Sequence, residues 1–96
     1  MAGPIYKVYM GKATEAMCQL SDDERQTLLG NVMAAMEKYG GKSVLHCDSS
    51  WSSEQWPSFG IEEWPDLDAL QKYTQALRAL NWSRYFETMT VLGTKR

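Results

Sequence analysis

The sequence is poor in the residues that bind metals or form disulfides. It holds one histidine, His46, and two cysteines, Cys18 and Cys47. Neither cysteine belongs to a CxxC pair, and one histidine with two scattered cysteines is a poor zinc-binding set. A disulfide between the two cysteines stays open, whereas in a reducing compartment both are expected to be buried thiols. Nothing else supports haem ligation by His46, so we expect no metal and no cofactor.

Long apolar runs and an excess of positive charge are also missing. No stretch approaches the roughly 20 apolar residues that cross a bilayer, and the start, MAGPIYKVYMGK, lacks the apolar centre of a signal peptide. The net charge is −2, with no basic stripe, which argues against a nucleic-acid partner. We therefore expect one cytoplasmic domain over residues 1–96, with no nucleic-acid or membrane partner.

Hydrophobic patterning and capping signals predict four strands and two main helices. Runs rich in β-branched and aromatic residues predict strands at 4–11, 42–48, 58–64 and 84–93. A connector at 13–20 has room for one helical turn. A capping box of Ser21 and Glu24 predicts the start of the first helix, and Gly40-Gly41 its end. Asp66 is the expected N-cap of the second helix, which Asn81 ends.

The resulting order, β-α-β-β-α-β, predicts a ferredoxin-like sandwich. This α+β fold places two helices on one face of a four-stranded antiparallel sheet. The strands are apolar on both faces: Ile5 and Tyr9 point to one side of the first strand, and Tyr6, Val8 and Met10 point to the other. An apolar face of that size needs a cover. The simplest cover is the sheet of a second copy, so we expect a homodimer through the sheet face.

Two segments carry a resemblance to a known superfamily. The hairpin region VLHCDSSWSSEQWPSFGIEEWPD and the ending NWSRYFETMTVLG resemble small uncharacterised members of the dimeric α+β barrel superfamily. The resemblance implies a homodimer whose sheets form a barrel, often with a pocket between sheet and helices. Members include cofactor-independent monooxygenases, polyketide cyclases, lactone isomerases and haem-degrading enzymes, and also stress proteins without known chemistry. No catalytic motif of one branch matches, so no catalytic residue is transferred.

The resemblance and the residues together leave two functions open. The first is a small-molecule pocket protein, as a cofactor-independent cyclase, isomerase or monooxygenase acting on an aromatic or polyketide-like carbonyl compound. The second is a non-catalytic homodimer that senses stress or ligands, or serves as an interaction module. The second function predicts a filled interior, with no pocket beyond a few water volumes.

The stretch HCDSSWSSEQWPSFG, residues 46–60, holds the main candidate for acid–base chemistry. Histidine is the side chain that changes charge near neutral pH. In a strand, His46 and Asp48 share a face, so Asp48 is the candidate to orient the imidazole. Cys47 points the other way and is expected to pack in the core. The alternative is an inert His46 that is bonded to backbone or to Asp48.

The rest of this stretch has a structural and a binding interpretation. Ser52-Ser53-Glu54-Gln55 can form a small capping box, with Trp51 and Trp56 as a hydrophobic staple, which predicts a one-turn helical lid. The two indoles can also line a pocket mouth, with Tyr9 and Tyr85 completing an aromatic wall.

A pair of adjacent glutamates supplies a second acid–base candidate. Glu62 and Glu63 point to opposite faces of a strand, so one of them joins a largely covered face. We take Glu63 as the candidate acid or base. The alternative is an ion pair across neighbouring strands, for which Lys7 and Arg84 are possible partners.

Overall fold

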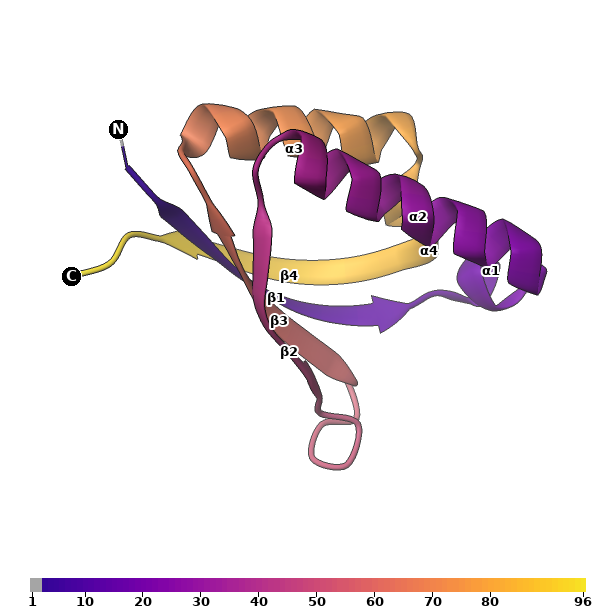
Figure 1. Cartoon of the computed structure of the whole chain (residues 1–96). Coiled ribbons are helices and arrows are strands. Elements are labelled where there is room, and N and C mark those ends of the chain that lie inside the picture. The colour runs from indigo at the N-terminus through magenta and orange to yellow at the C-terminus, as the bar shows by residue number, and fades with distance from the viewer. Residues whose placement is uncertain (1–2) are drawn as a thin grey trace.

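The computed structural model describes residues 3–96 as a two-layer α+β fold, with the helices stacked on one face of the sheet (Figure 1). The elements follow in the order β1 (Ile5–Ala13), α1 (Glu15–Cys18), α2 (Asp22–Lys38), β2 (Lys42–Asp48), β3 (Ser58–Trp64), α3 (Leu67–Ala79), α4 (Trp82–Tyr85) and β4 (Phe86–Gly93). The predicted β-α-β-β-α-β order is confirmed, with two short helices added.

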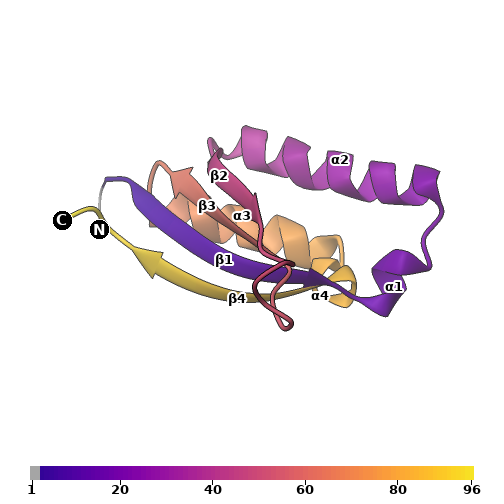
Figure 2. The same ribbon diagram turned by 90° about the horizontal axis from the view of Figure 1, so that it is seen from below.

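The sheet has the strand order β2-β3-β1-β4, and all neighbouring strands are antiparallel. This is the order of a ferredoxin-like sheet, with the first and third strands at the centre and the second and fourth at the edges. Seen from below, the strands pass in front of α3, and α2 runs alongside the edge strand β2 (Figure 2). The predicted fold class is therefore confirmed.

Both long helices begin at the capping residues that the sequence indicates. The Ser21 amide donates to Glu24 Oε1 at 2.9 Å, and the Glu24 amide donates to Ser21 Oγ at 3.1 Å. These two bonds complete the capping box of α2. At α3 the Ala69 amide donates to Asp66 Oδ1 at 2.8 Å. The local sequence therefore fixes where each helix starts before any tertiary contact is made.

The core lies between the sheet and the helices, around the fully buried Trp64. The Trp64 ring packs on Tyr73 of α3, with 4.4 Å between ring centroids. The other buried members of this cluster are Ile5, Leu70 and Leu77. Helix α2 adds Val32, Ala35, Met36 and Tyr39 to this cluster, all of them only partly buried. Thus α3 is seated firmly on the sheet, while no residue of α2 is fully buried.

Gly41 is expected to be intolerant of even a methyl group. A Cβ added there would overlap the indole of Trp64, whereas a Cβ on Gly30 in the middle of α2 meets no atom within 4 Å. Overpacking a filled core costs typically about 1–3 kcal/mol. Replacing an exposed mid-helix glycine by alanine gains about 0.5–1 kcal/mol. We expect Gly41→Ala to lower the free energy of unfolding and Gly30→Ala to raise it, as measured by urea denaturation. Changes of the same sign would contradict this packing.

The chain between α3 and β4 differs from the prediction. Asn81 adopts a left-handed conformation, with φ of 55°, and the next four residues form α4 before β4 starts at Phe86. The predicted strand start at residue 84 is therefore two residues early. Asparagine is one of the few residues that tolerates this conformation, so Asn81 ends α3 as expected but also redirects the chain into a further turn.

The predicted one-turn helical lid at residues 52–55 is wrong. The loop forms turns that close on Ser49, whose carbonyl accepts from the amides of Ser52 and Ser53 and whose hydroxyl donates to the Trp56 carbonyl at 2.7 Å. Ser53 Oγ accepts from the Trp56 amide at 3.0 Å, but no helix follows, because Pro57 disfavours helical geometry at the residue before it.

The cysteines also differ in part from the expectation. Both are free thiols. Cys18 ends the short helix α1 and is exposed, so the expectation of a buried thiol is wrong there. Cys47 is only partly buried, on a strand whose neighbour in the sheet at this position is Phe59.

The face of the sheet away from the helices carries exposed apolar side chains. Val8 lies at its centre, paired with Ile61 on one side and Val91 on the other. The exposed fraction is 40% for Val8 and 63% for Val91. We call this surface the open face. Among residues 3–96, no helix is both long and apolar enough to cross a membrane.

Candidate functional site

A cavity of about 460 Å³ lies between α2 and the helix side of the sheet. We call it the α2 cavity. Its roof is mainly apolar and is formed by Leu29, Val32, Met33 and Met36 of α2. Its floor is polar and is formed by Lys7, Tyr9, His46, Ser58 and Glu62 of the sheet. No residue of α2 is fully buried, and the cavity beneath it is far larger than a few water volumes.

Strand alternation brings the polar floor together. Tyr9 of β1 and His46 of β2 are each paired with Gly60 of the strand between them. Two strands apart, side chains are normally separated by about 10 Å. Gly60 has no side chain, so the Tyr9 phenol lies over it, and a Cβ there would collide with the phenol. The Tyr9 and His46 rings consequently approach to 6.4 Å between centroids, inclined by 27°.

A buried pair of opposite charges crosses the floor. Lys7 Nζ lies 3.8 Å from Glu62 Oε1, and these side chains are only 14% and 7% exposed. The same carboxylate oxygen accepts from Trp64 Nε1 at 3.1 Å, which ties it to the core. The Lys7 ammonium also lies 5.5 Å from the Tyr73 ring centroid and 5.8 Å from that of Tyr9. Such pairing is what keeps a charge tolerable at this depth.

The two tyrosines of the cavity hold their protons strongly. Burial raises the pKa of Tyr9, and the nearby charge of Glu62 raises it further. The same two causes, burial first, raise the pKa of Tyr73 above its usual range. Both phenols therefore remain hydrogen-bond donors at neutral pH, and they stand beside an ammonium group.

His46 stands at the mouth of the cavity. It lies on the edge strand β2, is exposed, and presents its ring to Tyr9. Within residues 3–96 its imidazole makes no hydrogen bond and no ion pair. A ligand that enters under α2 from this edge would meet the imidazole first.

Asp48 and the two loop tryptophans lie away from the cavity lining. Asp48 Oδ1 accepts from the Ser50 amide at 2.9 Å, and hydrogen bonds from Ser50 lower the pKa of Asp48. Trp51 is 84% exposed, and Trp56 is partly buried within the loop. In this geometry Asp48 closes a turn, and the two indoles belong to the hairpin tip.

Tyr85 and Glu63 are also held elsewhere. Tyr85 ends α4, and its backbone carbonyl accepts from the Thr14 amide at 3.0 Å. Glu63 lies on the open face, where its Oε1 accepts from the Tyr6 hydroxyl at 2.8 Å. That bond is the main cause of the raised pKa of Tyr6. Of the seven predicted site residues, Tyr9 and His46 line the α2 cavity.

The cavity lining also holds residues that were not among the predicted site residues, and the proposed chemistry depends most on Lys7, Glu62 and Tyr73. Lys7 shares its face of β1 with Ile5 and Tyr9, and Glu62 shares its face of β3 with Trp64. A charged residue that shares a strand face with core residues must be buried and paired. That pattern in the sequence could have identified both Lys7 and Glu62. Tyr73 follows from the apolar stripe of α3.

No cluster of ligands for a metal ion forms in the part of the chain that the structure describes. Nowhere in residues 3–96 do three or more His, Cys, Asp or Glu side chains gather in this way.

Solved structures share this fold at low sequence identity. A mutant chlorite dismutase from Candidatus Nitrospira defluvii matches 99% of this chain with a TM-score of 0.71 and 17% identity. SnoaB, a cofactor-independent oxygenase from Streptomyces nogalater, matches 99% of this chain and 95% of its own, with a TM-score of 0.53 and 18% identity. A protein of unknown function from Rhodopseudomonas palustris matches 100% of this chain and 85% of its own, with a TM-score of 0.65 and 16% identity.

These similarities show the fold, which is the ferredoxin-like α+β fold. The chain covers only 42% of the length of the chlorite dismutase. No known protein family and no curated protein matches the sequence.

Proposed function

We propose that the chain binds a small aromatic or polyketide-like carbonyl compound in the α2 cavity and promotes cofactor-independent proton transfer on it. The observation that carries this proposal is the gathering of an ammonium group, two protonated phenols and an imidazole beneath an apolar roof. An apolar cavity with a few convergent polar groups is the usual form of a small-molecule site. The similarity to a cofactor-independent oxygenase supports the same chemical class.

The floor suits a reaction that begins with an enolate. The ligand's carbonyl oxygen accepts a hydrogen bond from the Tyr9 phenol near the Lys7 ammonium. His46 then removes a proton from the carbon next to the carbonyl group. The electron pair of that C–H bond forms the C=C bond of the enolate, and the π pair of the C=O bond moves onto the oxygen. Donors placed where this negative charge develops lower the barrier. Cyclisation, isomerisation and oxygenation all continue from such an enolate.

Ligand binding without chemistry is the second candidate. It is favoured by the freedom of His46, whose ring has no hydrogen-bond partner in residues 3–96 to orient it. Effective general bases are usually held in place by a second group. Under this proposal the cavity binds the same class of compound without converting it, and the protein acts as a sensor of that compound.

Tryptophan fluorescence tests binding, because Trp82 also lines the α2 cavity. We expect naphthoquinones and hydroxylated naphthalenones to quench it saturably. Trp82→Phe should remove most of the ligand-dependent change. Trp51→Phe should leave it intact, because Trp51 is exposed and absent from the cavity lining. An equal loss in both variants would contradict binding in this cavity.

His46→Gln separates the two candidates once a compound that binds is found. For an enzyme we expect turnover to fall about 10²- to 10⁴-fold while the dissociation constant changes little. Absorbance spectroscopy of the ligand measures turnover, and fluorescence measures binding. Full turnover in His46→Gln would remove the proposed base. A bound ligand that is never converted by the wild-type protein favours the second candidate.

We further propose that the chain forms a homodimer through the open face. The apolar side chains of this face lie on the side of the sheet opposite to the α2 cavity, so that dimerisation would leave the cavity accessible. A contiguous exposed apolar surface of this kind is unusual on a monomer.

A further inference from the structure

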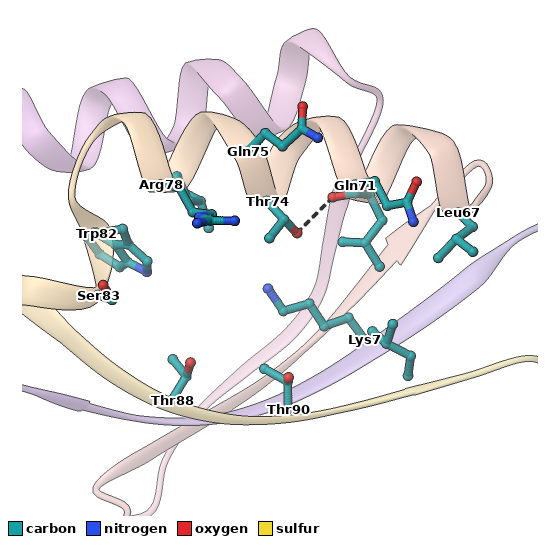
Figure 3. A pocket seen from close by; sticks show the side chains of 13 residues that line it. Lys7, Leu67, Gln71, Thr74, Gln75, Arg78, Trp82, Ser83, Thr88 and Thr90 are labelled. Atoms are coloured by element: carbon teal, nitrogen blue, oxygen red, sulfur yellow. Dashed lines mark hydrogen bonds between the residues drawn. The ribbon is translucent and has the colours of Figure 1, made fainter.

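A second hollow lies between α3 and the edge strand β4, with a volume of about 700 Å³. We call it the α3–β4 groove. Figure 3 shows its two walls: Gln71, Thr74 and Arg78 come from α3, while Thr88 and Thr90 rise from β4. Lys7 reaches into the space between these walls from β1. The groove is on the helix side of the sheet, so a dimer through the open face would leave it free.

The charge of the groove is one-sided. Lys7 and Arg78 are its charged lining residues, and no aspartate or glutamate lines it in the described part of the chain. Arg78 makes no ion pair within residues 3–96. This is unexpected in a chain whose net charge is −2. Two cations facing one hollow without a lining carboxylate favour an anionic ligand there.

Lys7 has unused capacity to bind such an anion. Its ammonium has three donors. Its nearest acid, Glu62, is 3.8 Å away, which is an ion-pair distance but too long for a hydrogen bond. Within residues 3–96 the ammonium makes no hydrogen bond, although the side chain is only 14% exposed. A buried ammonium group normally uses its donors, so an oxyanion in the groove would complete this site.

The uncharged residues that line the groove indicate what the rest of the ligand is like. The hydroxyl groups of Thr88, Thr90 and Ser83 add uncharged polar contacts near the cations. Leu70, Leu77 and Trp82 add an apolar wall. An inorganic anion would leave this wall uncovered, whereas an organic acid with an apolar or aromatic body would contact both parts.

We infer that the α3–β4 groove binds the carboxylate of a small organic acid with an apolar body, using Lys7 and Arg78 as anion-binding groups. The groove shares Lys7, Leu77, Trp82 and Thr88 with the α2 cavity, whereas Arg78 lines the groove alone. The inference does not depend on proton transfer in the α2 cavity.

The test uses two probes of the same size, 1-naphthoate and its uncharged amide, 1-naphthamide, followed by NMR of the ¹⁵N-labelled protein. We expect naphthoate to shift the amide signals of Thr74 and Thr90, which line the groove but not the α2 cavity, and to bind at least about tenfold more tightly than naphthamide. Equal affinity for the two probes, or naphthoate shifts confined to Val8 and Val91 on the open face, would overturn the inference.

Variants identify the residues. Arg78→Gln should weaken naphthoate binding several-fold while leaving naphthamide binding unchanged, and Arg96→Gln makes the same charge change outside the groove and should have no effect. Lys7→Gln should have the larger effect, but it also leaves Glu62 without its partner, so Arg78→Gln decides if the Lys7 variant does not fold. His46→Gln should bind naphthoate normally, which separates this site from the α2 cavity. If Arg78→Gln and Arg96→Gln weaken naphthoate binding equally, the anion is attracted only by the overall charge of the protein, and the proposed site is rejected.

Discussion

Replacement of Trp64 by alanine is expected to lower the free energy of unfolding by about 3–5 kcal/mol. The indole is fully buried, packs on Tyr73 with 4.4 Å between centroids, and fills the space that Gly41 leaves open. Its Nε1 also donates to Glu62, whose carboxylate is buried beside Lys7. The alanine variant therefore loses packing and leaves a buried acceptor with one donor fewer. The total free energy of unfolding of a native protein is about 5–15 kcal/mol, so this substitution removes a large part of it.

Two further variants separate the causes of that loss. Trp64→Phe keeps an aromatic ring but removes the donor to Glu62, and we expect it to cost about 1–3 kcal/mol from the unpaired acceptor, in addition to the lost packing volume. Trp51→Ala removes an indole that is almost fully exposed and should change stability by no more than about 0.5 kcal/mol. Urea denaturation followed by circular dichroism measures all three variants. A similar loss in Trp51→Ala and Trp64→Ala would contradict the assignment of the core.

Val8→Glu is expected to convert a dimer into single chains. Val8 lies at the centre of the open face, between Ile61 and Val91 on the neighbouring strands. If two copies bury this face against each other, the substitution places a carboxylate from each copy in an apolar interface, where an unpaired charge is costly. Size-exclusion chromatography with light scattering should give twice the mass of one chain for the wild-type protein and the mass of one chain for the variant.

Met33→Glu is the matched control for this experiment. Met33 is also an exposed apolar residue, but it lies on α2, in the helix layer on the other side of the sheet. The Met33→Glu variant should keep the mass that the wild-type protein shows in light scattering. Val8 is 40% exposed in the single chain, so we expect Val8→Glu to stay folded, as circular dichroism can check. A wild-type protein that is a single chain at all concentrations would refute the dimer.

The fold could be predicted because its signals are local. Ser21 with Glu24, and Asp66, mark helix starts through bonds that their own sequence neighbours complete. The strand boundaries at 42–48 and 58–64 follow from short apolar runs between turn residues, and both agree with the structure. Right-handed crossover connections then leave few ways to arrange four strands and two helices.

The composition of the site could be predicted only in part, because it depends on register and on how closely a helix packs. Alternation shows that Glu62 and Glu63 face opposite ways, but only the pairing of Lys7 with Glu62 shows which of them faces the helices. The apolar stripe of α2 predicts a packed helix, yet no residue of α2 is fully buried, and a cavity lies between this helix and the sheet. No local signal in the sequence encodes that separation.

The position of β1 also governs how the chain can fold. This strand is made before the other three, but its two neighbours in the sheet are β3 and β4, and Tyr6 is paired with the distant Gly93. The entropy of closing such a long loop must be overcome before the pairing contributes any stability. On the ribosome β1 therefore stays without its neighbour β4 until β4 has been made. Unpaired strand edges and exposed apolar residues favour aggregation during such an interval.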